Sequence, residues 1–198
     1  MKYISTRGNS TAVSSAQAIN LGMVPQGGLF VPQSIPEVSI PFTDNSYQKM
    51  AHQVLAPFLT DFSSVELNDC ITRAYNSTTF DAPSVIGMKK LSSKMSVMEL
   101  WHGPTAAFKD VALQIMPHFM QYSKQKINNK RHTVILVATS GDTGKAALEG
   151  FKNCEGISII VFYPHGGVSE VQRLQMATTD GSNTYVAAVR GNFDDCQT

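Results

Sequence analysis

The stretch TVILVATSGDTG, residues 133–144, decides how this chain folds. Its first half, Thr133 to Ala138, is a continuous run of apolar and β-branched residues, which is typical of a central strand covered on both faces. Its second half changes to glycine and hydroxyl-bearing residues, as expected where a strand passes into the first turn of a helix. The stretch therefore predicts a strand, a tight turn and a helix in immediate succession.

On its C-terminal side the same alternation continues. ISIIVFY at residues 157–163 is a second apolar run, and TYVAAV at residues 184–189 supplies a third. Helical segments after Gly144 and after Ser169 connect these runs. Strands that alternate with helices build a mostly parallel sheet through right-handed crossovers. We therefore expect an α/β fold with the sheet flanked by helices.

On the N-terminal side, MSVMELW at residues 95–101 is expected to be a short strand that opens this α/β region. It is followed by AFKDVALQIMPHFMQYSKQ at residues 107–125, whose apolar residues recur with helical spacing. Pro117 falls inside this segment and removes one amide donor, so it should kink or shorten the helix.

The first part of the chain has a different character. Three amphipathic helical patterns are expected around residues 12–23, 47–59 and 67–75, and the loop PQGGLFVPQSIPEV at residues 25–38 separates the first two. Ser14 with Gln17 and Ser63 with Glu66 have the spacing of capping boxes. The character changes near Ser92 to Ser96. We therefore expect a helical N-terminal domain at residues 1–93 and an α/β domain at residues 94–198.

Composition limits the classes of partner. The formal net charge is +1, and no run of basic residues is present, so neither a nucleic acid nor an anionic membrane is an expected partner. No apolar stretch follows the N-terminus or reaches bilayer-spanning length, which favours a cytoplasmic protein. The three cysteines and five histidines are scattered and lack metal-binding spacing, so we expect no metal site.

The segment HGPTAAFKD, residues 102–110, lies where a strand is expected to meet a helix, and α/β proteins bind ligands at such positions. A lysine at the start of a helix and beside Phe108 would be partly desolvated, which favours the neutral amine that condenses with an aldehyde. Lys109 is thus a candidate Schiff-base lysine; taken without its motif, it would be an ordinary surface lysine. His102 and Thr105 either line the same site or only shape the turn.

The turn ATSGDTG, residues 138–144, is the second candidate. Hydroxyl groups and free amides at a helix N-terminus form a cradle for a carboxylate or a phosphate, and Gly141 and Gly144 permit close approach of the backbone. A capped turn without a ligand explains the turn alone equally well. A nucleotide-binding P-loop does not, because Thr139 and Ala146 stand where that motif needs Gly and Ser or Thr.

Together, HGPTAAFKD and ATSGDTG resemble threonine synthase, a family of the fold-type-II pyridoxal-phosphate enzymes. Further similar segments extend the resemblance over nearly the whole chain: SSAQAINLGM (14–23), GGLFVP (27–32), YPHGGVS (163–169), QRLQM (172–176) and GNFDDCQ (191–197). One departure is Gly167, where some members of the family have lysine.

The resemblance implies conversion of O-phospho-L-homoserine and water to L-threonine and phosphate, with pyridoxal 5'-phosphate as cofactor. It implies that Lys109 binds the cofactor and then moves protons, and that Phe108 and Asp142 lie beside the cofactor. It further implies that the substrate carboxylate is held by five residues of the turn: Thr139, Ser140, Gly141, Thr143 and Gly144.

Members of the family are roughly twice this length or more, as expected of a multi-domain chain. Their cradle for the cofactor phosphate would lie beyond Thr198, so we expect these 198 residues alone to be inactive. Two other readings stay open. One is another enzyme of the same fold type, such as threonine dehydratase or a cysteine-synthase-like protein. The other is a non-catalytic relative that binds a phosphorylated ligand or a partner.

Overall fold

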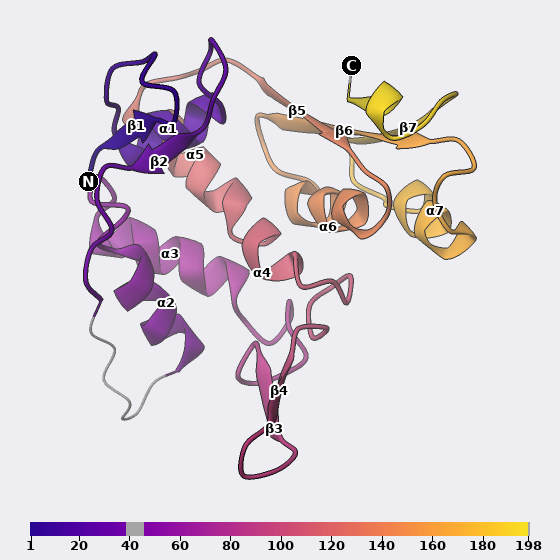
Figure 1. Cartoon of the computed structure of the whole chain (residues 1–198), viewed down its shortest axis with the longest axis horizontal. Helices are drawn as coiled ribbons and strands as arrows, with labels where there is room; N and C mark the ends of the chain where they lie inside the picture. Colours follow the sequence, from indigo (N-terminus) through magenta and orange to yellow (C-terminus); the bar gives the residue numbers. More distant parts are fainter. Residues whose placement is uncertain (39–45, 198) are drawn as a thin grey trace. The chain divides into compact units, whose positions relative to one another are not determined.

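A computed structural model describes residues 1–38 and 46–197, in two compact units (Figure 1). The first unit comprises Met1–Asn76 and His118–Lys130, and the second comprises Ser77–Pro117 and Arg131–Thr198. The bounds of these units differ from those of the expected domains, residues 1–93 and 94–198. Residues 77–93 pack with the second unit, and residues 118–130 pack with the helices of the first.

The first unit contains the three expected N-terminal helices, α1 (Ser15–Leu21), α2 (Tyr47–Leu55) and α3 (Ser64–Ala74). Both predicted capping boxes are present, since Ser14 and Ser63 each accept a hydrogen bond from the backbone amide three residues later. The segment expected to be only an extended loop also contains β2 (Phe30–Pro32), which pairs antiparallel with β1 (Tyr3–Ser5). Three-residue strands are too short to give a clear alternation in the sequence.

The inner face of α3 supplies much of the core of this unit. Leu67, Cys70, Ile71 and Ala74 are all buried and recur at the spacing of a single helix face. Burial raises the pKa of the Cys70 thiol to about 12, so that this sulfur stays protonated and unreactive. Cys70 is therefore a packing residue.

The second unit is built on a three-stranded parallel sheet. Its strands are β5 (Thr133–Ala138), β6 (Ile157–Pro164) and β7 (Thr184–Val189), in the order β5-β6-β7. Helices α6 (Asp142–Phe151) and α7 (Glu170–Ala177) lie on the same face of this sheet (Figure 1), and the short 3-10 helix η1 (Asp194–Cys196) follows β7. The α/β fold class with a parallel sheet and flanking helices is confirmed.

The position of the first strand differs from expectation. β5 is an edge strand and β6 is the central one, and the second face of β5 is open, with Val134 and Leu136 exposed by 53% and 67%. On β6 the residues facing the helices, Ile157, Ile159 and Val161, are fully buried. An apolar run identifies a strand but does not show how many of its faces are covered.

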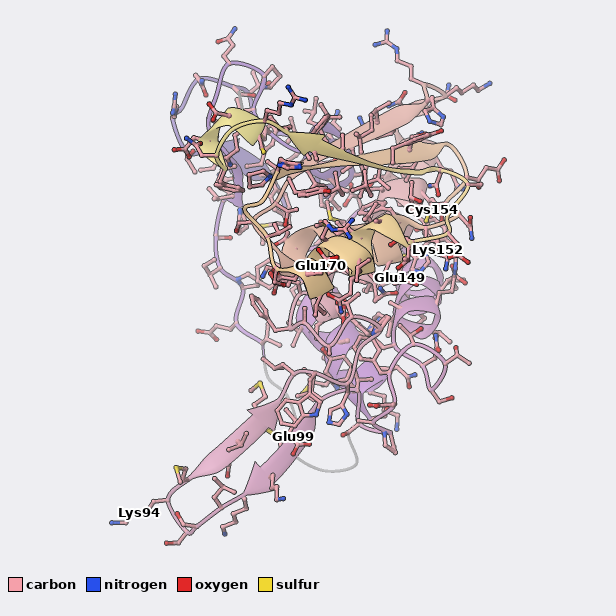
Figure 2. All side chains as sticks on the ribbon, turned by 90° about the vertical axis from the view of Figure 1, so that its right-hand side faces the viewer. Lys94, Glu99, Glu149, Lys152, Cys154 and Glu170 are labelled. Carbon is pink, nitrogen blue, oxygen red and sulfur yellow. The ribbon has the colours of Figure 1, made fainter. Side chains whose placement is uncertain are left out.

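The predicted strand at residues 95–101 does not belong to the parallel sheet. It appears as β4 (Ser96–Glu99), which pairs antiparallel with β3 (Gly87–Lys90) in a separate hairpin. Figure 2 shows this hairpin projecting from the second unit, with Lys94 at its tip and Glu99 near its base. The sequence pattern predicted that these residues form a strand. It did not predict that this strand pairs with β3.

The helix expected at residues 107–125 is divided in two. α4 (Asp110–Leu113) is a single turn, and α5 (Met116–Lys126) begins one residue before Pro117. A proline is compatible with the first turn of a helix, where its missing amide has no acceptor, but not with its interior. Pro117 therefore ends the first helix and lies in the first turn of the second.

Within the described ranges, no helix is both long enough and apolar enough to cross a membrane.

Candidate active site

Lys109 and Asp142 are brought together in the second unit. Lys109 is the residue before α4, and Asp142 is the first residue of α6. The Lys109 ammonium donates to both carboxylate oxygens of Asp142, with Nζ to oxygen distances of 2.9 Å. The lysine side chain is 27% exposed, so the amine is reachable from solvent but held in one direction. Two residues predicted for the same site from separate motifs are thus in direct contact.

Phe108 contributes an aromatic face to this pair. Its ring centroid lies 4.4 Å from the Nζ of Lys109, within the range of a cation–π interaction. The ring itself is 58% exposed, which leaves a flat apolar surface beside the amine. Phe108 is therefore available to contact a planar ligand group that approaches Lys109.

The turn that precedes Lys109 is fastened by a buried carboxylate. Asp110 is 0% exposed and accepts hydrogen bonds from the backbone amide and the hydroxyl of Thr105, at 2.8 and 2.7 Å. A β-carbon on Gly103 would lie 2.5 Å from the Asp110 β-carbon, so only glycine fits there. Ala106 has a φ of 57°, a left-handed conformation that is strained for any residue but glycine. The turn is compact and fixed.

His102 opens this turn and is held by two carboxylates. Its Nδ1 lies 2.6 Å from Asp81, and its Nε2 lies 3.0 Å from Glu99 on β4. The hydrogen bonds to Glu99 and Asp81 raise the pKa of His102 above its ordinary value. The contacts of His102 in this structure are thus with residues around the turn.

The side chain of Thr139 organises the second motif from within. It is 1% exposed, and its hydroxyl oxygen accepts hydrogen bonds from the amides of Gly141 and Gly144, at 3.1 and 3.0 Å. The same hydroxyl lies 3.1 Å from the carbonyl oxygen of Gly141. In this structure the Thr139 hydroxyl therefore bonds to its own turn, whereas the resemblance had implied that Thr139 is one of the residues that hold the substrate carboxylate.

The other residues of the turn occupy distinct positions. Ser140 is exposed, while Asp142 and Thr143 are partly exposed in the first turn of α6, where backbone amides have no acceptor within the helix. Gly141 and Gly144 are buried: a β-carbon on Gly141 would meet Gln172 of α7, and one on Gly144 would meet Thr139, Val161 and Met176. The glycines thus serve close packing, and Ser140 and Thr143 are the hydroxyl groups accessible to a ligand.

This arrangement offers two chemical functions. A partly buried amine is presented beside a carboxylate and an aromatic ring, and hydroxyl groups and helix amides stand in the adjoining turn. Within the described part of the chain, no group of three or more His, Cys, Asp or Glu residues is arranged to hold a metal ion. The site is therefore equipped to bind an aldehyde covalently and an anion by hydrogen bonds.

Two contributors had not been singled out from the sequence. Asp110 was only a letter of the lysine motif, and its burial against Thr105 depends on the turn geometry, since their spacing of five residues is not that of a capping box. Gln172 reaches Gly141 from α7, a contact that follows from the packing of two helices on one sheet face. Neither contact has a signal in local sequence.

Comparison with known proteins agrees with these features. The sequence profile described as "Threonine synthase N terminus" matches residues 2–75. Threonine synthase from Pseudomonas aeruginosa is 38% identical over 202 residues, which is 100% of this chain and 42% of that protein. Threonine synthase-like 2 from Homo sapiens is 36% identical over 201 residues, covering 98% of this chain and 41% of that protein. The chain thus spans about two fifths of the length of these relatives.

Solved structures give the same result. A threonine synthase from Brucella melitensis, described as bound to PLP, superposes with a TM-score of 0.88 at 36% identity, over 100% of this chain and 43% of that one. The yeast threonine synthase superposes with a TM-score of 0.88 at 34% identity, over 99% and 42%. The chain therefore corresponds, in sequence and in fold, to the N-terminal part of threonine synthases.

Proposed function

We propose that this chain supplies the reactive amine of a threonine synthase, an enzyme that converts O-phospho-L-homoserine and water to L-threonine and phosphate. The observation that carries the proposal is the contact of the Lys109 amine with Asp142, beside the exposed ring of Phe108. The amine is held in one direction and is still reachable from solvent, and its neutral form is the one that condenses with an aldehyde. The relative from Brucella melitensis that is described as PLP-bound supports pyridoxal phosphate as the aldehyde.

The residues present fit this cofactor in part. Lys109 would hold it covalently, Phe108 would contact its ring, and Asp142 would lie beside the ring hydroxyl. Pyridoxal phosphate, when bound, supplies an aldehyde carbon for amines and an electron sink for charge that develops on the substrate. Among the described residues, none is assigned here to a pocket for the cofactor phosphate.

The chain's own residues would bind the substrate and move its protons. Lys109 would carry protons at its Nζ between the substrate carbons, and Asp142 would direct that nitrogen by accepting its hydrogen bonds. Ser140 and Thr143 would donate hydroxyl hydrogen bonds to the substrate carboxylate, aided by the amides of the first turn of α6. Thr139, Gly141 and Gly144 would shape the turn that presents these donors.

Borohydride trapping tests this assignment directly. The chain is incubated with pyridoxal phosphate, reduced, digested and mapped by mass spectrometry. We expect the Lys109 peptide to be labelled well above the peptides of exposed lysines such as Lys90, because the Phe108 ring beside Lys109 would contact the cofactor. Lys109→Arg is the matched control, since it keeps the charge but cannot form the adduct. Equal labelling of Lys109 and Lys90 would count against the proposal.

Because the chain spans about two fifths of its relatives, we further propose that the 198 residues alone bind the cofactor weakly and release no phosphate from O-phospho-L-homoserine. A near-visible absorbance band that is stoichiometric with the chain would contradict this. Phosphate release is to be measured on a protein that has the full length of the family members.

A second candidate is a threonine-synthase-like protein that lacks the synthase reaction. It is favoured by the similar identities to threonine synthases and to proteins named threonine synthase-like 2, which are 38% and 36% for the two relatives above. Phosphate release from O-phospho-L-homoserine, measured beside ketoacid formation from threonine, separates the synthase from both this relative and a dehydratase. Trapping at Lys109 without either activity would favour the second candidate.

A further inference from the structure

We propose that Asp110 is a positioning residue, which aims the Lys109 amine by clasping the turn in front of it through Thr105. This inference rests on the proposed function of Lys109 and adds the element that would direct it. It is carried by burial and by hydrogen-bond geometry within the second unit.

The burial of Asp110 calls for a compensating role. A carboxylate that is 0% exposed loses its hydration, and it is tolerated where hydrogen bonds replace the lost water. Thr105 provides two such bonds, one from its amide and one from its hydroxyl, and they reach different oxygens of the carboxylate. A two-point contact of this kind fixes the orientation of the turn as well as its distance from α4.

The two hydrogen bonds between Asp110 and Thr105, here called the clasp, close a short ring of residues that includes Lys109. Residues 105 and 110 are its two ends, and Ala106 is held between them with a φ of 57°. Strained backbone of this sort persists where the surroundings determine it, as the two Thr105 bonds do here. Because Lys109 lies within this ring, a change in the backbone of the turn would also move Lys109 and shift its Nζ relative to Asp142.

The other end of α4 is fixed independently. The Leu113 carbonyl oxygen lies against Gly150 of α6, where a β-carbon would come within 2.2 Å of it. Because α4 is held on α6 at that end, the clasp sets the direction of Lys109, the residue that precedes α4. Asp110 thus acts through the position of Lys109 and not by contact with a reacting atom.

Competitive acetylation of lysines, measured at a series of pH values, tests the proposal on the chain alone. The readout is the rate of labelling of Lys109 relative to Lys90, by mass spectrometry. Thr105→Val removes the hydroxyl donor, so Lys109 should leave Asp142 and label about threefold faster, with a changed pH profile. Thr105→Ser restores the hydroxyl and should return the wild-type profile.

Asp110→Asn provides a second variant with a milder change. Its amide oxygen can accept from the Thr105 amide while its nitrogen donates to the Thr105 hydroxyl oxygen, so the profile should stay close to wild type. Ile157→Val, a core change at the far end of β6, controls for general loosening and should leave the profile unchanged. The proposal is overturned if Thr105→Val behaves as wild type, or if Ile157→Val alters the profile as much.

This outcome is separate from that of the proposed function. If acetylation follows the expected pattern while borohydride trapping labels Lys109 no more than Lys90, the clasp positions the amine but the amine is not the cofactor lysine. If trapping is selective and acetylation is insensitive to Thr105, the lysine assignment stands and the role of Asp110 is rejected.

Discussion

The carbonyl oxygen of Leu113 occupies the space that a side chain on Gly150 would need, at 2.2 Å from the ideal β-carbon position. This contact joins the helix that follows Lys109 to the helix that begins at Asp142. Because the obstructing atom belongs to the backbone, no side-chain movement can relieve it.

Gly150→Ala should therefore destabilise the second unit by about 1–3 kcal/mol, since the added methyl group forces α4 and α6 apart. Urea denaturation followed by circular dichroism measures this change. Val171→Ala, at a position on α7 that is 66% exposed, is the control and should change stability little. A wild-type midpoint for Gly150→Ala would show that α4 does not depend on this contact.

Thr139→Val should destabilise the chain and loosen the turn before α6. The substitution keeps the shape of the side chain but leaves the amides of Gly141 and Gly144 without their acceptor in a buried place. Each unsatisfied group costs about 1–3 kcal/mol. Hydrogen exchange at these two amides, measured by NMR, should become faster, and Thr139→Ser should restore protection. Unchanged exchange in Thr139→Val would indicate that another group holds the turn.

The fluorescence of Trp101, the single tryptophan of the chain, should report the protonation of His102. The two rings have centroids 5.7 Å apart, and a protonated imidazole quenches a neighbouring indole. Hydrogen bonds to Glu99 and Asp81 raise the pKa of His102 above 6.5. The emission of Trp101 should therefore increase as the pH increases, with a midpoint above pH 6.5. Glu99→Gln should lower the midpoint, and His102→Gln should abolish the transition.

The raised pKa of His102 also determines how its contribution to stability changes with pH. The pKa of His102 is raised in the folded chain, so its bonds to Glu99 and Asp81 contribute fully below the ordinary value of 6.5. That contribution is lost as the pH increases through the raised value. The difference in urea midpoint between the wild type and His102→Gln should therefore shrink from acidic to alkaline pH. A difference that grows with pH would contradict the assignment.

Leu136→Lys should reduce the binding of the apolar dye ANS without unfolding the chain. Leu136 is 67% exposed on the open face of β5, next to the exposed Val134 on the same face. A charged group there costs little burial, whereas Ile159→Lys would place a charge in a fully buried position and should unfold the second unit. Dye fluorescence and far-ultraviolet circular dichroism distinguish the two results.

Much of the fold followed from the sequence. The strands at residues 133–138, 157–163 and 184–189 and the helices after Gly144 and Ser169 were predicted from apolar periodicity and capping residues, which are local signals. The place of β5 at the edge of the sheet and the pairing of β4 with β3 were not, because both depend on which other segments pack nearby. Local pattern determines the element, and tertiary contacts determine its neighbours.

The candidate site shows the same division. The residue types at Lys109 and Asp142 indicated the chemistry. The strand expected before Lys109 is β4 of a separate hairpin, so its position did not indicate the contact between the two residues. The inward direction of the Thr139 hydroxyl and the burial of Asp110 could not be predicted, since both result from backbone torsions within the turns. Whether these residues bind a cofactor and a substrate stays a prediction for the experiments above.

Lys109 and Asp142 are separated by only 33 positions along the chain. Closing a loop of that length costs little entropy, so the pair can form early, while later parts of a nascent polypeptide are still being synthesised. Both groups of the pair therefore come from one continuous segment, residues 109–142, so the direction of the amine depends on a partner that is always close in sequence.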